Sequence, residues 1–324
     1  MSSNMSSKIR SAFSAVAATL AIAAISPAQA QQAREVRLLM GWFAQADQSG
    51  YWQAQIDNQG KNNGLVIKTL PGGPKIQTIP QVASGQAEFG VGNADDLLLA
   101  RMRGAPVKAV FVSLDYVPYT LVYHTDPAIK TIADLKGRTF AVNIGFAYWE
   151  WIKKREGMQG TREIPVSGDL SLFRQDKNMV QQGYSIFLPA RMTEAGIDNS
   201  QFVVASLGYR PYAVLFTTDE LIQKNPQLVR DTIAAVKASW GKFAKDPSES
   251  KRLELSLNNQ ISPGVHDKAV KEIVSDLLPK DLSKIGCMND ARWDELGKQL
   301  KEVNFLPADF DVRKAYDKSF VPGC

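Results

Sequence analysis

The sequence contains few of the residues that build metal sites and nucleophilic active sites. Only two histidines and two cysteines occur among its 324 residues. It also lacks the Gly-x-Ser-x-Gly, His-Glu-x-x-His and phosphate-binding-loop patterns that mark many hydrolases, zinc proteases and nucleotide-binding proteins. Because no activated nucleophile or metal-ligand set can be assembled, we expect a protein that is not an enzyme and needs neither metal nor cofactor.

Charge of one sign is not concentrated in any part of the chain. The 38 Lys and Arg residues are scattered and nearly balanced by 33 Asp and Glu residues, which gives a net formal charge of +5. No basic stripe, zinc-knuckle spacing or RNA-binding aromatic motif is present, and this argues against nucleic-acid binding. The hydrophobic (44%) and charged (22%) fractions are ordinary for a globular protein, and the length suits one large or two ordinary domains.

Long apolar runs are absent apart from one near the N-terminus. Two basic residues precede an alanine-rich run over residues 12–25, and Ala28-Gln29-Ala30 has the small-x-small pattern of a signal-peptidase site. A transmembrane anchor is the alternative, but the run is shorter than the roughly 20 residues that span a bilayer. We therefore expect a signal peptide over residues 1–30, cleaved after Ala30, and a soluble periplasmic mature chain.

Cys287 and Cys324 are the only cysteines. An even number in an exported chain suggests a disulfide, whereas two free thiols are the alternative. A bond between them would hold the C-terminal tail and contribute about 3–4 kcal/mol to stability.

Strand-like and helix-like segments alternate along the first third of the chain. Expected strands at 36–40, 65–69, 88–91 and 107–113 are separated by expected helices at 51–59, 75–84 and 95–103. This rhythm predicts an α/β fold with a mainly parallel sheet covered by helices on both faces. The middle block repeats it, with expected strands at 138–142, 164–166, 184–188 and 202–206, and the pattern after Asp219 is mostly helical.

Two similar extended segments enclose the middle block. Residues 117–123 (VPYTLVY) and 210–216 (RPYAVLF) each combine Pro-Tyr with an apolar run. If they are antiparallel strands that cross between two lobes, residues 124–210 form a lobe inserted into the first, and the pair can serve as a hinge for closure around a ligand. They can equally be ordinary core strands, and periodicity alone does not separate the two interpretations.

Several short motifs accompany these elements. They are Gly41-Trp42-Phe43 with Gly50-Tyr51-Trp52, Pro71-Gly72-Gly73, VASGQAEFGV over residues 82–91, ADLKG over residues 133–137, and DKNMVQQGY over residues 176–184. Together they resemble the NMT1/THI5-like branch of the ABC-transporter periplasmic substrate-binding proteins (NitT/TauT-type). That branch includes receptors for thiamine-precursor pyrimidines and for riboflavin, with relatives for sulfonates, taurine and nitrate. The resemblance covers nearly the whole expected mature chain.

The resemblance implies the type II periplasmic-binding fold, in which two α/β lobes with mixed, mostly parallel sheets are joined by two crossing hinge strands. Lobe 1 would comprise residues 34–117 and 217–324, lobe 2 residues 124–210, and the hinge strands residues 118–123 and 211–216. After DKNMVQQGY many relatives continue with Ser/Thr-Glu-Pro, whereas this chain has Ser185-Ile186-Phe187, so a polar position close to the cleft becomes apolar.

Candidate ligand contacts in lobe 1 follow the expected strands, because ligands of such sheets bind beyond the carboxyl ends of the strands. Trp42 can stack on a flat ring and Gln45 can hydrogen-bond to it, although both can also be ordinary core and loop residues. Tyr51, in the neighbouring motif, is a further candidate. Asn93 can contact a ligand or simply cap the helix that is expected to begin at Asp95.

The junction at residues 143–151 (NIGFAYWEW) is the strongest signal in the middle block. It holds four aromatic residues in six positions, and one helical face cannot bury all of them. We expect Asn143, Phe146 and Tyr148 at the ligand, with Trp149 next, while burial in the core is the alternative.

Residues near the expected hinge complete the candidate set. Tyr116 and Tyr119, with Tyr209, could close an aromatic box around the ligand. Asp176 can accept a hydrogen bond from an amine or a ring N–H, or it can cap a helix that starts at Lys177.

The resemblance implies the periplasmic component of an ABC importer, a monomer that delivers its ligand to permease subunits. The aromatic candidates favour a small aromatic or heterocyclic nutrient that is captured by lobe closure. An anionic ligand such as a sulfonate, taurine, nitrate or an aromatic acid is the alternative, and it would use arginines such as Arg138, Arg174 or Arg210. A third interpretation is an enzyme like the fungal pyrimidine synthases of this family, which depend on histidine and a cysteine-rich motif. This chain has only His124 and His266 and no cysteine cluster.

Overall fold

A computed structural model describes residues 34–60, 64–321 and 323–324, and these belong to one compact unit. The expected signal peptide over residues 1–30 lies outside the described residues. In the described part of the chain, no helix is both long and apolar enough to cross a membrane.

Sheet A has the strand order β2-β1-β3-β10-β4. It consists of β1 (Arg34–Leu39), β2 (Leu65–Leu70), β3 (Phe89–Asn93), β4 (Val107–Leu114) and β10 (Ala213–Thr218). β1 is parallel to β2 and β3, whereas β10 is antiparallel to β3 and β4. The first three strands therefore form the expected parallel β-α-β arrangement, and the returning strand β10 makes the sheet mixed.

Sheet B has the order β7-β6-β8-β5-β9. It consists of β5 (Tyr119–Tyr123), β6 (Thr139–Val142), β7 (Arg162–Pro165), β8 (Met179–Tyr184) and β9 (Ser200–Val203). β6 is parallel to β7 and β8, and β5 is antiparallel to β8 and β9. Both sheets are thus mixed α/β sheets of the same pattern.

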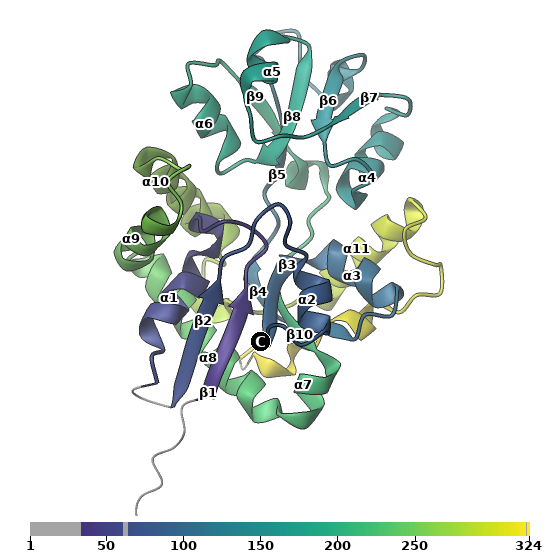
Figure 1. The fold of residues 1–324 in the computed structure, drawn as a ribbon. Helices are drawn as coiled ribbons and strands as arrows, with labels where there is room; N and C mark the ends of the chain where they lie inside the picture. Colours follow the sequence, from purple (N-terminus) through teal and green to yellow (C-terminus); the bar gives the residue numbers. More distant parts are fainter. Residues whose placement is uncertain (1–33, 61–63, 322) are drawn as a thin grey trace, which may run out of the picture. The chain divides into compact units, whose positions relative to one another are not determined.

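Helices cover both sheets (Figure 1). Those that follow strands of sheet A are α1 (Ser49–Asp57), α2 (Thr78–Ala83), α3 (Ala94–Met102), α7 (Asp219–Lys224), α8 (Pro226–Lys245), α9 (Ser248–Leu257), α10 (Pro263–Glu272), which continues as a π-helix (Ile273–Leu277), and α11 (Asp290–Glu302). Those of sheet B are α4 (Ala147–Glu156), α5 (Ser171–Gln175) and α6 (Leu188–Glu194). Short 3-10 turns lie at Ala46–Gln48, Ile132–Leu135, Val204–Leu207, Leu282–Lys284, Val312–Ala315 and Lys318–Phe320. We call sheet A with its helices lobe 1 and sheet B with its helices lobe 2.

The chain passes twice between the sheets, and these passages differ from the expected hinge strands. β5 is an inner strand of sheet B and β10 an inner strand of sheet A, so the segments 118–123 and 211–216 lie almost entirely inside the sheets. Their apolar runs are buried there, and only their proline ends lie in the passages. Because proline has no N–H for a strand ladder, the crossing falls at these ends, where Val117 N donates to Pro211 O at 2.8 Å.

A strand expected at residues 184–188 lies earlier in the chain. β8 ends at Tyr184, and α6 begins at Leu188. The strand was not recognised from the sequence, because two of its buried residues are the polar Gln181 and Gln182, and glutamine is seldom fully buried. The alternative role of Asp176 as the cap of a helix starting at Lys177 is wrong, because α5 ends at Gln175 and β8 begins at Met179.

Packing of lobe 1 depends on close contact between α1 and α8. Gly50 lies against the indole of Trp240, and a Cβ on it would come within 2.0 Å of that ring. Only glycine fits this position without moving the helices apart. Tyr51 packs edge-on against the same indole with ring centroids 5.4 Å apart, so this part of the motif serves the core.

Cys287 and Cys324 form a disulfide, with Cα atoms 5.5 Å apart. It ties the C-terminus to the segment before α11, as the cysteine count suggested.

Candidate ligand-binding site

The two lobes meet where β3 ends and β5 begins. Asn93, the last residue of β3, donates its Nδ2–H to Tyr119 Oη at 2.8 Å. Tyr209 Oη donates to Asp95 Oδ2, the second residue of α3, at 2.9 Å. Since the parallel strands of sheet A end at this edge, the contact brings the ligand-binding edge expected for such sheets against lobe 2.

A cluster of tyrosines from lobe 2 lies at this meeting edge. Tyr119 of β5 and Tyr148 of α4 stack with ring centroids 4.5 Å apart and an angle of 20° between the rings. Tyr184, at the end of β8, packs edge-on against Tyr119 at 5.7 Å. We call Tyr119, Tyr148, Tyr184 and Tyr209 the tyrosine cluster. Flat aromatic faces of this kind are suited to stack on a flat ligand.

Gln182 fixes the orientation of the Tyr148 ring. Its Oε1 accepts hydrogen bonds from the Tyr148 hydroxyl and from the backbone N–H of Asn143, the latter at 2.7 Å. Both bonds are largely shielded from water, because Gln182 is buried, and a buried bond of this kind is costly to break. The side chain therefore couples the end of β8 to the loop before α4.

Two carboxylates of α3 lie beside the tyrosines. Asp95 is buried, and burial together with repulsion from Asp96 raises its pKa to about 7. Burial likewise raises the pKa of Asp96 to about 6, although a hydrogen bond from Asn93 and the charge of Arg103 oppose the increase. Both carboxyl groups therefore titrate close to neutral pH.

A third carboxylate comes from the turn after β1. Burial raises the pKa of Asp47 to about 7, opposed by a hydrogen bond with Gln45 and reinforced by the charge of Glu254. Its Oδ1 atom is inaccessible to water and has no hydrogen-bond partner in the described part of the chain. The pKa of Tyr184 is raised by burial and then by the charges of Asp47, Asp96 and Asp95. All three carboxylates thus act on the tyrosine cluster.

The remaining lobe 1 candidates lie around this edge. Trp42 is 43% exposed and packs edge-on against Phe43 at 5.4 Å. The loop that carries it is fixed by Gly72, whose N–H donates to Trp42 O at 2.9 Å and where a Cβ would lie 2.1 Å from Met40 O. Gln45 is buried beside Asp47.

The aromatic junction before α4 divides between two environments. Phe146 is 40% exposed, whereas Tyr148 belongs to the tyrosine cluster. Trp149 is fully buried and stacks on Phe140 at 4.8 Å, inside lobe 2. Helical geometry accounts for this division, because residues adjacent along a helix point to different sides.

Two other candidates lie apart from the cluster. Tyr116 lies in the first passage between the lobes, under the guanidinium of Arg210 at 5.0 Å. Asp176 lies before the start of β8, where its carboxylate accepts from Asn178 N at 2.8 Å. That is the opposite end of β8 from Tyr184, so Asp176 lies away from the tyrosine cluster.

The candidates chosen from the sequence include neither Gln182 and Tyr184 nor the carboxylates Asp47, Asp95 and Asp96. The DKNMVQQGY motif contains both missed residues, but it was used only to recognise the family. The sequence signal for these two residues was the segment Gln181-Gln182-Gly183-Tyr184, which places polar side chains and a tyrosine at the end of a strand. Asp95 and Asp96 fit a helix N-terminus so well that their second role was not evident.

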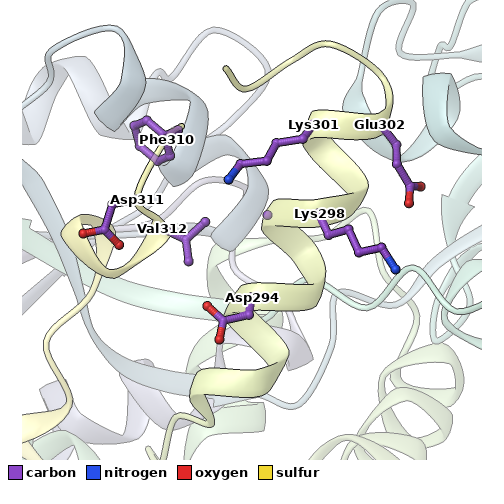
Figure 2. A pocket seen from close by; sticks show the side chains of 8 residues that line it. Asp294, Lys298, Lys301, Glu302, Phe310, Asp311 and Val312 are labelled. Atoms are coloured by element: carbon purple, nitrogen blue, oxygen red, sulfur yellow. The ribbon is translucent and has the colours of Figure 1, made fainter. Parts of the chain in front are cut away.

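A separate pocket of about 640 Å³ lies between α11 and the C-terminal segment (Figure 2). It is lined by Asp294, Gly297, Lys298, Lys301, Glu302, Phe310, Asp311 and Val312. Lys301 extends towards Phe310 across it, whereas Lys298 and Glu302 point away (Figure 2). None of the residues expected from the sequence lines this pocket. Its rim is of mixed charge, and it lacks the convergent aromatic and polar groups of the tyrosine cluster.

The paired mixed sheets and the site at their meeting edges define a periplasmic-binding-protein fold, which solved structures share. One of them, the periplasmic aliphatic sulphonate binding protein SsuA from Escherichia coli, is 16% identical with a TM-score of 0.65, covering 86% of this chain and 91% of that one. The chain belongs to the NMT1/THI5-like family, whose model matches residues 45–250.

Two curated relatives are also similar to this chain in sequence. The riboflavin-binding protein RibY of Chloroflexus aurantiacus is 22% identical over 250 residues, covering 72% of this chain and 70% of the relative. The 4-amino-5-hydroxymethyl-2-methylpyrimidine phosphate synthase of Legionella pneumophila is 21% identical over 307 residues, covering 89% and 92%.

Proposed function

We propose that this protein is the periplasmic solute-binding component of an ABC importer and that it captures a small aromatic or heterocyclic nutrient between its two lobes. The stack of Tyr119 on Tyr148 carries the proposal, because it places two aromatic faces at the edge where the lobes meet. Asn93 and Gln182 supply polar groups that can orient a ring. A thiamine-precursor pyrimidine or a riboflavin-like molecule has this shape and polarity, and relatives named for such molecules support the choice.

Closure by movement of the lobes is part of the proposal. Arg292 of α11 donates to the carbonyl oxygens of Asp115 and Arg210, both at 2.8 Å, and these residues lie in the two passages between the lobes. Asp115 and Arg210 also pair at 2.7 Å. The passages are thus held side by side at lobe 1, as a hinge requires, while the sheets on either side can rotate.

Hydrogen bonds join the two lobes on both sides of the hinge, as a closed form requires. Ser185 at the end of β8 donates to Glu272 of α10 at 3.0 Å, and Ser262 donates to Glu194 of α6 at 2.8 Å. On the other side, Lys154 of α4 donates to the carbonyl oxygen of Glu302. Ligand binding to the closed form would shift the population towards it, and the closed monomer would dock on the permease.

The arginines available for an anionic ligand are engaged elsewhere. Arg138 pairs with Asp126 at 3.1 Å, and Arg174 donates to Ala195 O at 2.8 Å. Arg210 pairs with Asp115 in the hinge. We therefore rank a sulfonate or another anion below a heterocycle, although structural relatives are sulfonate-binding proteins.

Binding without catalysis is favoured over pyrimidine synthesis. His124 donates its Nε2–H to Phe173 O at 2.7 Å, inside lobe 2. His266 is sealed in the core with Glu254. Among the described residues, no group of three or more His, Cys, Asp or Glu side chains is placed to hold a metal ion.

Calorimetry with substituted protein tests the proposal. Replacing Tyr148 by leucine should weaken binding of the small molecule that co-purifies, identified by mass spectrometry, about tenfold or more through loss of stacking and buried area. Tyr123→Leu is the matched control, because Tyr123 stacks on Phe202 at 5.3 Å at the other end of β5. Equal loss of affinity in both variants, or none in Tyr148→Leu, would contradict the proposed site.

A further inference from the structure

We propose that the ligand carries a positive charge on or beside its flat ring, and that Asp47, Asp95 and Asp96 are the carboxylates that select it. The inference rests on the proposed function, because it assigns the charge of the molecule held by the tyrosine cluster. It concerns residues for which the sequence suggested no role beyond a loop position and the N-terminus of a helix.

The carboxylates and the stacked tyrosines are joined by hydrogen bonds. Asn93 Nδ2 donates to Asp96 Oδ2 at 3.2 Å and to Tyr119 Oη at 2.8 Å, so one amide contacts a carboxylate and a ring of the stack. On the other side of α3, Asp95 accepts from Tyr209 at 2.9 Å. Acidic and aromatic groups therefore form one largely buried hydrogen-bonded network and not two separate features.

Asp47 adds an acceptor that the described residues leave unsatisfied. Its Oδ1 is shielded from water and has no hydrogen-bond partner in the described ranges. Its charge raises the pKa of Tyr184 of lobe 2 and of Tyr51 of α1, so the carboxylate lies near both rings. Buried acceptors are rarely left unpaired, and an N–H of a ligand at this edge would satisfy it.

The charges around the site do not neutralise the three carboxylates. Asp47 faces a further acidic residue, Glu254 of α9, whose Oε2 lies 2.5 Å from His266 Nε2. Asp95 and Asp96 repel each other, and the charge of Arg103 lowers the pKa of Asp96 without restoring an ordinary value.

The tyrosines that face these carboxylates can donate hydrogen bonds but carry no charge at neutral pH. Burial and the nearby carboxylates raise the pKa of all four members of the cluster. The negative potential of the three carboxylates thus acts on any ligand that lies against the tyrosine cluster. A cation gains from it and from the ring faces, which attract cations, whereas an anion is repelled.

Calorimetry with three flat probes of different charge tests the inference. Thiamine carries a permanent positive charge, riboflavin is uncharged and toluenesulfonate is an anion. We expect thiamine to bind most tightly, with an affinity that rises at least tenfold between about pH 5.5 and about pH 8, because the carboxylates must ionise to pair with it. Titrations in buffers of different ionisation enthalpy should show protons released on binding.

Isosteric substitutions separate the carboxylates from general packing. Asp47→Asn, Asp95→Asn and Asp96→Asn should each weaken thiamine binding about tenfold and flatten its pH dependence. Asp309→Asn is the charge-matched control, because Asp309 is exposed on the C-terminal segment. Thermal melting of the unliganded variants identifies any that fail to fold. Because three positions are substituted one at a time, the test remains decisive if one variant does not fold.

Three outcomes would overturn the inference. One is tighter binding of riboflavin or toluenesulfonate than of thiamine in a Tyr148-dependent manner, which leaves the proposed function standing. Another is thiamine binding with no pH dependence and no effect of the three substitutions. The third is failure of thiamine to bind at millimolar concentration, in which case the proposed function is decided separately by the co-purifying molecule.

Discussion

Tyr119 and Tyr148 stack with ring centroids 4.5 Å apart, although one begins β5 and the other lies in the first turn of α4. Two neighbours from different strands, β3 and β8, hold the hydroxyl groups of the stacked rings. Asn93 of lobe 1 holds the hydroxyl of Tyr119, and Gln182 of β8 holds the hydroxyl of Tyr148. The pair is therefore both a part of the lobe 2 core and the surface that lobe 1 contacts.

Gln182→Leu should lower both stability and ligand affinity. The substitution leaves two buried donors, Tyr148 Oη and Asn143 N, without their acceptor, at a cost of about 1–3 kcal/mol. Affinity should fall because the Tyr148 ring loses its anchor. The matched control is Gln181→Leu, since Gln181 points to the other face of β8 and donates to Ser167 O at 3.2 Å. Thermal melting and calorimetry on both variants check this, and equal affinities for the two would contradict it.

The unliganded protein should lose stability as the pH rises from about 5 to about 8. Asp95 has a folded-state pKa of about 7, above its value in an unfolded chain, so the folded state binds more protons in this range. Its favourable contribution is complete below the unfolded pKa and is lost as the pH rises through the folded pKa.

Asp95→Asn should reduce this loss, to which the raised pKa values of Asp47 and Asp96 also contribute, with a gain on the order of 2–4 kcal/mol at about pH 8. The same variant should bind a cationic ligand less well, which is the usual conflict between stability and function at a binding site. Urea unfolding of wild type and variant at several pH values provides the measurement. A variant that is no more stable than wild type at about pH 8 would show that Asp95 is not under strain.

Loss of the disulfide should destabilise the protein by about 2–4 kcal/mol with little change in affinity. Cys287 and Cys324 close a loop with a sequence separation of 37 residues within lobe 1. The double variant Cys287→Ser/Cys324→Ser should melt at a lower temperature. Native protein should show no free thiol in a thiol assay, and two reactive thiols after unfolding without reductant would refute the bond.

Arg292→Leu should loosen the hinge. The substitution removes the hydrogen bonds to both passages and the contact of the guanidinium with the Tyr212 ring at 4.5 Å. We expect a several-fold change in ligand affinity and a larger spread of interlobe distances, measured by paired spin labels on the two lobes. Arg313→Leu is the control, because Arg313 pairs with Asp294 at 3.2 Å on the surface of lobe 1. Identical distance distributions for the two variants would argue against a hinge role for Arg292.

The sequence was sufficient for the fold class because the relevant signals are local. Alternating apolar segments predicted the β-α-β rhythm, whereas the assignment of Asn93, Tyr119 and Tyr148 to the ligand site stays a prediction. The hinge was harder to locate, because buried apolar runs such as those of β5 and β10 look alike in any sheet. Only the prolines next to them mark where the chain leaves the sheets.

A candidate site residue was hard to predict when a structural role, such as core packing or stabilising a helix end, explained its presence equally well. Trp149 and Tyr148 are adjacent aromatic residues, yet one fills the core and the other the meeting edge, a difference set by helix orientation and not by composition. Asp95 and Asp96 satisfy a helix N-terminus and also face the tyrosines, and the second role depends on a lobe that begins in another part of the sequence. Gln182 was not predicted, because its two hydrogen-bond partners, Tyr148 Oη and Asn143 N, are brought to it only by the folding of lobe 2.

A crystal structure of the protein with its tightest-binding probe tests the central claim most directly. The account predicts electron density for the ligand against the rings of Tyr119, Tyr148 and Tyr184, with a nitrogen of the ligand within hydrogen-bonding distance of Asp47, Asp95 or Asp96. Density instead in the pocket between α11 and Phe310, with the tyrosine cluster unchanged, would contradict it.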